Sequence, residues 1–140
     1  MARSSMHVLL LLAATALASC VTEPQPAGVR GTVTSAATAA PVAGARVAIT
    51  RCYFGGPTCI DLAADSSDLA GRFVLTLQVP ISDSAACGLT TFSASAPGYA
   101  TYLASLAAVG TPGDACDGRA AGVAIALTPS GSAGAVQFVR

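Results

Sequence analysis

The stretch SDLAGRFVLTLQV, residues 67–79, contains the clearest structural signal in this chain of 140 residues. Asp68 and Gly71 belong to the residue types that form tight turns. After them, every second residue is a large apolar one: Phe73, Leu75, Leu77 and Val79. A period of two is typical of a β-strand with one buried face. The stretch therefore predicts a turn followed by a half-buried strand.

The same period recurs along the chain. We expect seven strands, within residues 29–34, 45–50, 60–65, 72–79, 89–96, 99–106 and 122–127. Two alanine-rich runs, 36–40 and 104–108, favour helix by propensity, but they are too short to form stable helices unaided, and we interpret them as loop or strand end. Short strands joined by turns, without a helical stripe, predict an all-β fold: a seven-stranded antiparallel β-sandwich of the Ig-like Greek-key type.

The first 19 residues have the composition of a signal peptide. Arg3 supplies positive charge, an apolar run follows from Val8 to Ala18, and small residues end the segment. The run is well short of the roughly 20 residues that span a bilayer as a helix. Leu17-Ala18-Ser19-Cys20 matches the motif that bacterial lipoprotein signal peptidase cleaves, which predicts a mature chain that begins at a lipid-modified Cys20. The alternative is ordinary secretory cleavage after Ala18, with Cys20 left as a free thiol.

Residues 20–27, with Pro24 and Pro26, predict a short extended linker between the lipid and a domain at 28–128. The lipid would attach the protein to a membrane of the bacterial cell envelope. Val21 stands where enteric bacteria place the aspartate that retains lipoproteins in the inner membrane, so in a bacterium with two membranes we expect the outer one. Residues 129–140 are a tail whose segment 135–139 either adds an edge strand or frays.

The mature sequence is poor in catalytic side chains. Lysine is absent, and the single histidine, His7, lies in the signal segment. Histidine-based nucleophilic and zinc sites are therefore excluded, and acid-base catalysis would depend on carboxylates alone. Without Arg3, six of the seven basic residues remain against all seven acidic ones, and a net charge near −1 does not favour nucleic acid as a partner. We expect a protein without enzymatic activity, cofactor or metal.

Four short motifs follow one another at a characteristic spacing. They are Gly31-Thr32-Val33-Thr34, Pro41-Val42-Ala43-Gly44-Ala45-Arg46-Val47, Ser67-Asp68-Leu69-Ala70-Gly71-Arg72-Phe73 and Ala96-Pro97-Gly98-Tyr99. In this order they resemble the carboxypeptidase regulatory-like domain, a transthyretin-like (prealbumin-like) seven-stranded sandwich. The resemblance covers roughly residues 28–127 and implies the same fold. A hydrolase of purine breakdown with a similar fold uses histidines and a characteristic C-terminal motif. The mature part of this chain has neither.

Four further cysteines depart from the family pattern: Cys52, Cys59, Cys87 and Cys116. If each predicted strand crosses the sandwich once, all four fall in or beside connections at one end of the domain. The sequence leaves three pairings open, and we expect Cys52 to pair with Cys59 and Cys87 with Cys116. The two bridges would stiffen one cluster of loops.

Tyr53 and Phe54 follow the first of these cysteines and precede Gly55-Gly56. Exposed aromatic rings can stack on a sugar or pack on an apolar patch of a partner; alternatively, these two cover the end of the sandwich and bind nothing. We expect a structural or adhesion/binding module that contacts an envelope protein or a glycan. The alternative is an accessory subunit that binds carbohydrate or peptide for uptake at the outer membrane.

Overall fold

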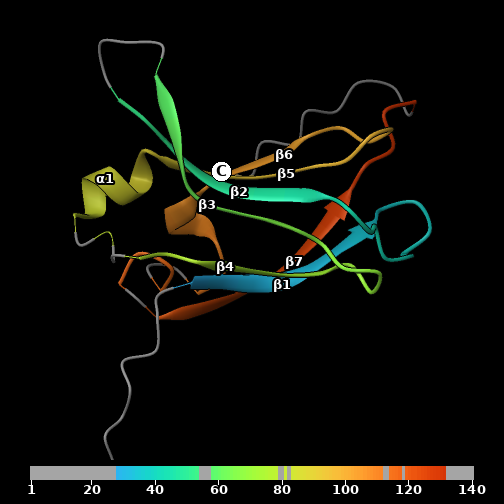
Figure 1. The fold of residues 1–140 in the computed structure, drawn as a ribbon, viewed down its shortest axis with the longest axis horizontal. Coiled ribbons are helices and arrows are strands. Elements are labelled where there is room, and N and C mark those ends of the chain that lie inside the picture. The colour runs from blue at the N-terminus through green and yellow to red at the C-terminus, as the bar shows by residue number, and fades with distance from the viewer. Residues whose placement is uncertain are drawn as a thin grey trace, which may run out of the picture.

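The computed structural model describes residues 28–53, 58–78, 81, 83–111, 114–117 and 119–131. Its strands form two sheets that lie in two facing layers (Figure 1). In sheet order, the smaller sheet contains β4 (Arg72–Thr76), β1 (Gly28–Ser35) and β7 (Ala120–Leu127). The larger sheet contains β3 (Cys59–Ser66), β2 (Arg46–Cys52), β5 (Thr90–Ser95) and β6 (Tyr102–Ser105). The predicted all-β class is confirmed, and each predicted strand has a counterpart.

The core lies between the two layers because apolar residues at every second position point inward from both. Val29 and Val33 of β1 and Val47 and Ile49 of β2 are all fully buried. Phe92 of β5 joins the layers, since its ring centroid lies 6.2 Å from that of Phe73 in β4 and 6.2 Å from that of Tyr102 in β6. The period of two in the sequence therefore corresponds to one continuous apolar core.

One strand pair is parallel, which corrects the prediction of a purely antiparallel arrangement. β1 pairs antiparallel with β4 but parallel with β7, with Gly31 opposite Val123. A Cβ atom at Gly31 would lie 1.8 Å from the carbonyl oxygen of Val123, so only glycine allows this approach. Alternation has the same period in parallel and antiparallel strands, and for that reason it does not reveal the direction of pairing.

A β-bulge in β3 changes which residues face the core. The alternation in the sequence predicts three inward residues: Ile60, Leu62 and Ala64. The register shifts between Ile49, which pairs with Ala63, and Thr50, which pairs with Asp61. An extra residue in one strand moves the following side chains to the opposite face, so Ala63 packs against the core and Ala64 is exposed. Of the three predicted residues, Leu62 packs against the core, whereas Ile60 and Ala64 are exposed.

Two short helical segments were not expected from the sequence. α1 (Ser84–Gly88) precedes β5, and the 3₁₀ turn η1 (Leu106–Ala108) follows β6, within the alanine-rich run that we interpreted as loop or strand end. β6 begins at Tyr102, later than predicted, and Tyr99 forms an isolated bridge with Pro129 instead. Within the described part of the chain, no helix is long and apolar enough to cross a membrane.

Candidate functional site

Both predicted disulfides form, and both lie at the same end of the two sheets (Figure 1). Cys52 ends β2 and Cys59 begins β3, so their bridge joins the two strands of one hairpin. Cys87 lies in α1, and Cys116 lies in the segment that precedes β7. The expected clustering of the four cysteines at one end is therefore confirmed.

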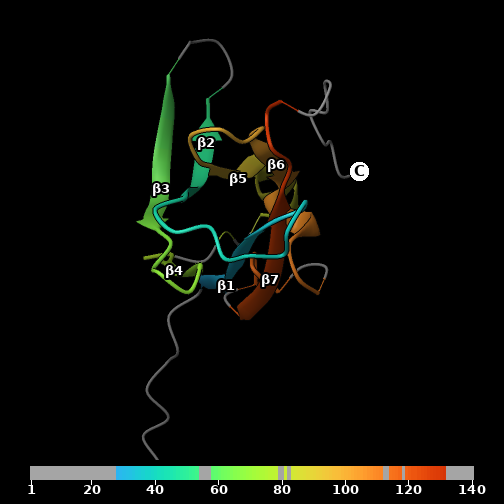
Figure 2. The same ribbon diagram turned by 90° about the vertical axis from the view of Figure 1, so that its right-hand side faces the viewer.

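The β2–β3 hairpin projects beyond the body of the two sheets (Figure 2). Cys52 and Cys59 are direct partners in the ladder, with 4.0 Å between their Cα atoms. Beyond the disulfide, the Tyr53 N–H donates a hydrogen bond of 3.3 Å to the carbonyl oxygen of Thr58. The covalent bond and the continuing ladder together restrict the motion of this projection.

The hairpin presents Tyr53 and Ile60 on the face opposite the disulfide. Arg51 pairs with Ile60 next to the cysteine pair, and side chains alternate between the two faces of a ladder, so Tyr53 lies on the same side as these two. Tyr53 is 55% exposed and Ile60 is 41% exposed. The sequence predicted an exposed Tyr53 but missed Ile60, which its alternation had placed in the core. Phe54, the other predicted binding residue, lies outside the described residues, as does Cys20.

A polar network lies at the base of the hairpin on the outer face of the larger sheet. The Thr50 hydroxyl donates to Asp61 Oδ1 at 2.8 Å, and Arg46 Nη2 donates to Asp61 Oδ2. Because Arg46 and Thr50 flank Ala48 on one face, the Arg46 side chain passes over Ala48, which is completely buried. Two contacts lower the pKa of Asp61 below its usual 3.8: the hydrogen bond from Thr50 has the larger effect, and the contact with Arg46 has the next largest.

This shift favours the ionised carboxylate. A general acid needs a pKa raised toward neutrality, and the pKa of Asp61 moves in the opposite direction. The same holds for Asp68, whose pKa is lowered chiefly by the hydrogen bond from the Arg72 N–H in the β3–β4 turn. Both carboxylates therefore act as fixed hydrogen-bond acceptors that hold strands and turns in place.

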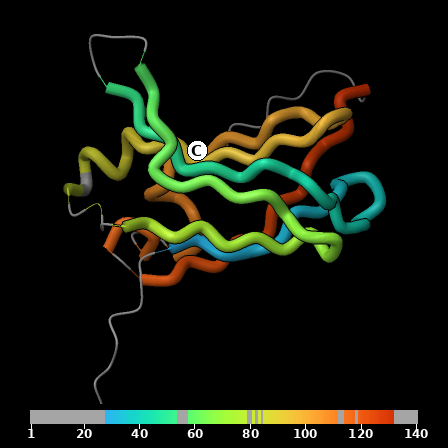
Figure 3. The backbone as a smooth tube through the Cα atoms, viewed as in Figure 1, coloured from blue at the N-terminus to red at the C-terminus, as the bar shows by residue number. Residues whose placement is uncertain are grey.

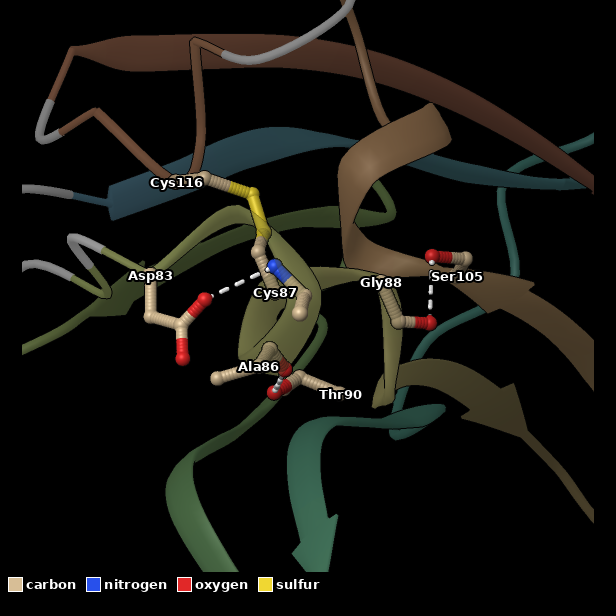
Figure 4. Close-up of a disulfide and its surroundings, with 8 residues drawn as sticks. Asp83, Ala86, Cys87, Gly88, Thr90, Ser105 and Cys116 are labelled. Atoms are coloured by element: carbon tan, nitrogen blue, oxygen red, sulfur yellow. Dashed lines mark hydrogen bonds between the residues drawn. A yellow bond between two sulfur atoms is a disulfide. The ribbon is translucent and has the colours of Figure 1, made fainter.

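The second disulfide is buried and holds α1 against the core (Figure 4). A helix of five residues is not stable alone, so its ends need partners. At the N-terminus, the Asp83 carboxylate accepts from the Ala85 N–H at 2.9 Å. At the C-terminus, the Thr90 hydroxyl donates to the Ala86 carbonyl oxygen at 2.8 Å, and the Ser105 hydroxyl donates to the Gly88 carbonyl oxygen at 3.1 Å.

One residue in the sequence is typical of the start of a helix at α1. Asp83 precedes an alanine pair, and aspartate is a preferred residue immediately before a helix. The partners at the other end, Thr90 and Ser105, lie in β5 and β6, so only the tertiary fold brings them to the helix. The predicted strands at 72–79 and 89–96 leave these residues between them, and a helix of five residues that depends on distant hydroxyl groups is too short to show a helical stripe.

No protein-family model matches the sequence, and no curated protein matches it significantly. Among solved structures, the chain is similar to a 9R-lipoxygenase from Cyanothece PCC8801, with 16% sequence identity and a TM-score of 0.45. The similar region covers 74% of this chain and 16% of the lipoxygenase chain. A similarity of this size gives no basis for assigning a fold or a function.

Proposed function

We propose that this chain is a lipoprotein of the bacterial cell envelope whose residues 28–128 form a transthyretin-like, Greek-key β-sandwich. In this proposal the sandwich is related to the carboxypeptidase regulatory-like domain and acts as a binding module without catalysis. The acylated Cys20 anchors it, and the linker at 20–27 separates it from the membrane. The order of the strands in the two sheets, with β1 in the centre of one and β2 and β5 in the centre of the other, supports a sandwich of this kind.

The observation that carries the binding role is the projecting β2–β3 hairpin. It is covalently closed at Cys52 and Cys59, and it exposes an aromatic and an aliphatic side chain on one face. An aromatic side chain held on a rigid element loses little conformational entropy when it is covered, which is why such residues serve as anchors at interfaces. We propose that Tyr53 and Ile60 contact an envelope protein or a glycan.

Photo-crosslinking in intact cells tests this role. A photoreactive amino acid at position 53 should form a discrete crosslinked product, and the same residue at position 69 should not. Leu69 is a suitable control because it is 90% exposed but lies in the β3–β4 turn, away from the hairpin. Equal products from both positions would contradict a binding role for the hairpin.

The second candidate is an accessory subunit that binds carbohydrate or peptide for uptake at the outer membrane. The exposure of Tyr53 favours this function too, because aromatic rings stack on sugars. Titration of free oligosaccharides and peptides into the full chain, followed by tyrosine fluorescence, separates the two functions. Uptake predicts a saturable change that is lost in Tyr53→Ala and retained in Leu69→Ala, whereas an adhesion module for a protein partner predicts none.

The lipid anchor has its own test. Mass spectrometry of the protein from bacterial membranes should find acyl groups on an N-terminal Cys20. The Cys20→Ala variant should carry no acyl groups, and it should either be released from the membrane or keep its signal segment. An unmodified N-terminus in the soluble fraction would exclude the anchor while leaving the binding role of the hairpin open to the crosslinking test.

A further inference from the structure

The first residues of β1 and β7 and the last residues of β4 lie side by side in the smaller sheet (Figure 3). Residues of these strand ends line a hollow of about 140 Å³ at the outer face of the sheet. Thr76, Gly28 and Ala120 lie side by side there across the three strands. Gly28 has no side chain, and a Cβ atom at that position would lie 2.4 Å from the Leu75 carbonyl oxygen. Ala120 carries only a methyl group. Side chains therefore rise little above the sheet at Gly28 and Ala120.

The next row of side chains forms one wall of the hollow and supplies its charge. Arg30 lies between Val74 and Gly122 on the outer face and lines the hollow together with Val74. Val74 is 62% exposed, which leaves an apolar surface beside a guanidinium group. Thr76, on the same outer face of β4 as Val74, also lines the hollow.

Arg30 makes no ion pair with any residue that the structure describes. By contrast, Arg46, Arg72 and Arg119 each contact an aspartate. Asp65, the acid at the strand edge beside Val74, already accepts hydrogen bonds from the N–H groups of Ser66 and Val74. Because no described acid forms an ion pair with Arg30, its guanidinium group is available to an anion at the hollow, and such a group binds the paired oxygens of a phosphate with two parallel hydrogen bonds.

The position of the hollow relative to the proposed anchor indicates which phosphate it meets. The chain enters β1 at Gly28, which is itself part of the hollow. Eight residues, 20–27, separate this point from the lipid, and they span at most about 29 Å when fully extended. A tether of this length keeps the local concentration of lipid headgroups high, so a weak site is sufficient.

We propose that this hollow binds the phosphodiester of an anionic membrane lipid, with Arg30 on the phosphate, Thr76 as a second donor and Val74 against the glycerol backbone. The proposal rests on the lipid anchor proposed above. It directs the outer face of the β4-β1-β7 sheet toward the membrane. The β2–β3 hairpin extends from the other layer, on the side away from that face (Figure 1), and is thereby presented outward.

The test uses the full chain with its native lipid, placed in nanodiscs of phosphatidylcholine alone or mixed with phosphatidylglycerol. Amide NMR shifts of residues 28–32, 74–76 and 120 should differ between the mixed discs and the discs of phosphatidylcholine alone. Arg30→Gln should weaken this response about fivefold, the effect of one arginine near an anionic surface. Arg51→Gln is the matched control, because Arg51 also makes no ion pair among the described residues and lies on β2.

The same response in Arg30→Gln as in the unchanged chain, or an equal loss in Arg51→Gln, would overturn the proposal. Thr76→Val, expected to weaken binding by a smaller factor, provides a second variant that leaves the strand intact. Inorganic phosphate titrated in phosphatidylcholine discs separates the two sources of phosphate: if it saturates the same amides while phosphatidylglycerol has no effect, the lipid is excluded as the ligand. A Cys20 without acyl groups would exclude the anchor and the lipid source together, and the phosphate titration of the full chain would then decide the anion site alone.

Discussion

The two disulfides belong to regions built in opposite ways. Cys52 and Cys59 are exposed, neighbouring partners in one ladder, and their bond closes a loop with a sequence separation of 7. Cys87 and Cys116 are buried, and their bond links segments with a sequence separation of 29. The first bond closes a projecting hairpin, whereas the second fixes a helix against the core. One end of this small domain therefore combines a buried bridge between distant segments with an exposed bridge inside a single hairpin.

Replacing the buried disulfide should have the largest effect. In Cys87→Ala with Cys116→Ala, we expect the free energy of unfolding to fall by about 4 kcal/mol, because a loop of roughly 30 residues contributes about 3.6 kcal/mol by chain entropy and the buried sulfur contacts are also lost. Denaturant titration of the purified protein measures the change. A loss smaller than that of the hairpin variant below would reverse the comparison.

Replacing the hairpin disulfide should cost less. In Cys52→Ser with Cys59→Ser, we expect a loss of about 2.5 kcal/mol at most, since the closed loop is only about eight residues long and the sulfur atoms are exposed. The same denaturant titration applies. Amide hydrogen exchange should rise in the hairpin strands and remain unchanged in β5, and faster exchange throughout β5 would show that the hairpin supports the core after all.

The two bonds should also differ in how quickly they are reduced. A thiol reagent reaches the exposed Cys52–Cys59 pair directly, but it reaches the buried pair only when α1 opens. With limited reductant followed by alkylation, mass spectrometry should find Cys52 and Cys59 modified first. Simultaneous modification of all four cysteines would mean that the two regions open together.

The smallest effect concerns the base of the hairpin. The pKa of Asp61 is lower in the folded chain than in the unfolded chain, so the unfolded chain binds more protons as the pH falls below about 4. Asp61 therefore adds to the free energy of unfolding at neutral pH, and this contribution is lost in acid. Its size stays below about 1 kcal/mol because the side chain is largely solvated. NMR titration of the Asp61 carboxyl should find a larger rise of its pKa in Thr50→Val than in Arg46→Gln, and the opposite order would make the ion pair the stronger contact.

Local patterns in the sequence predicted most of the strands and the cysteine pairing, because both depend on short-range periodicity and on strands crossing the domain once. Three features depended on tertiary context instead. The parallel β1–β7 pair joins the first and last strands, the bulge in β3 follows from its register with β2, and α1 needs hydroxyl groups from β5 and β6. For the candidate site, the sequence indicated Tyr53, whereas the exposure of Ile60 and the place of Arg30 at the hollow follow only from strand register and from the neighbouring strands.

Asp65 has a consequence for contacts between molecules. It belongs to β3, the edge strand of one sheet, and its carboxylate accepts the N–H of Val74 in β4, the edge strand of the other, at 3.1 Å. An unpaired N–H on a sheet edge is a template on which a foreign strand can add. Here that donor is already occupied by a charge from within the same chain. A foreign strand that added along this side would have to displace the Asp65 carboxylate from the Val74 N–H. The new ladder would offer that carboxylate no partner.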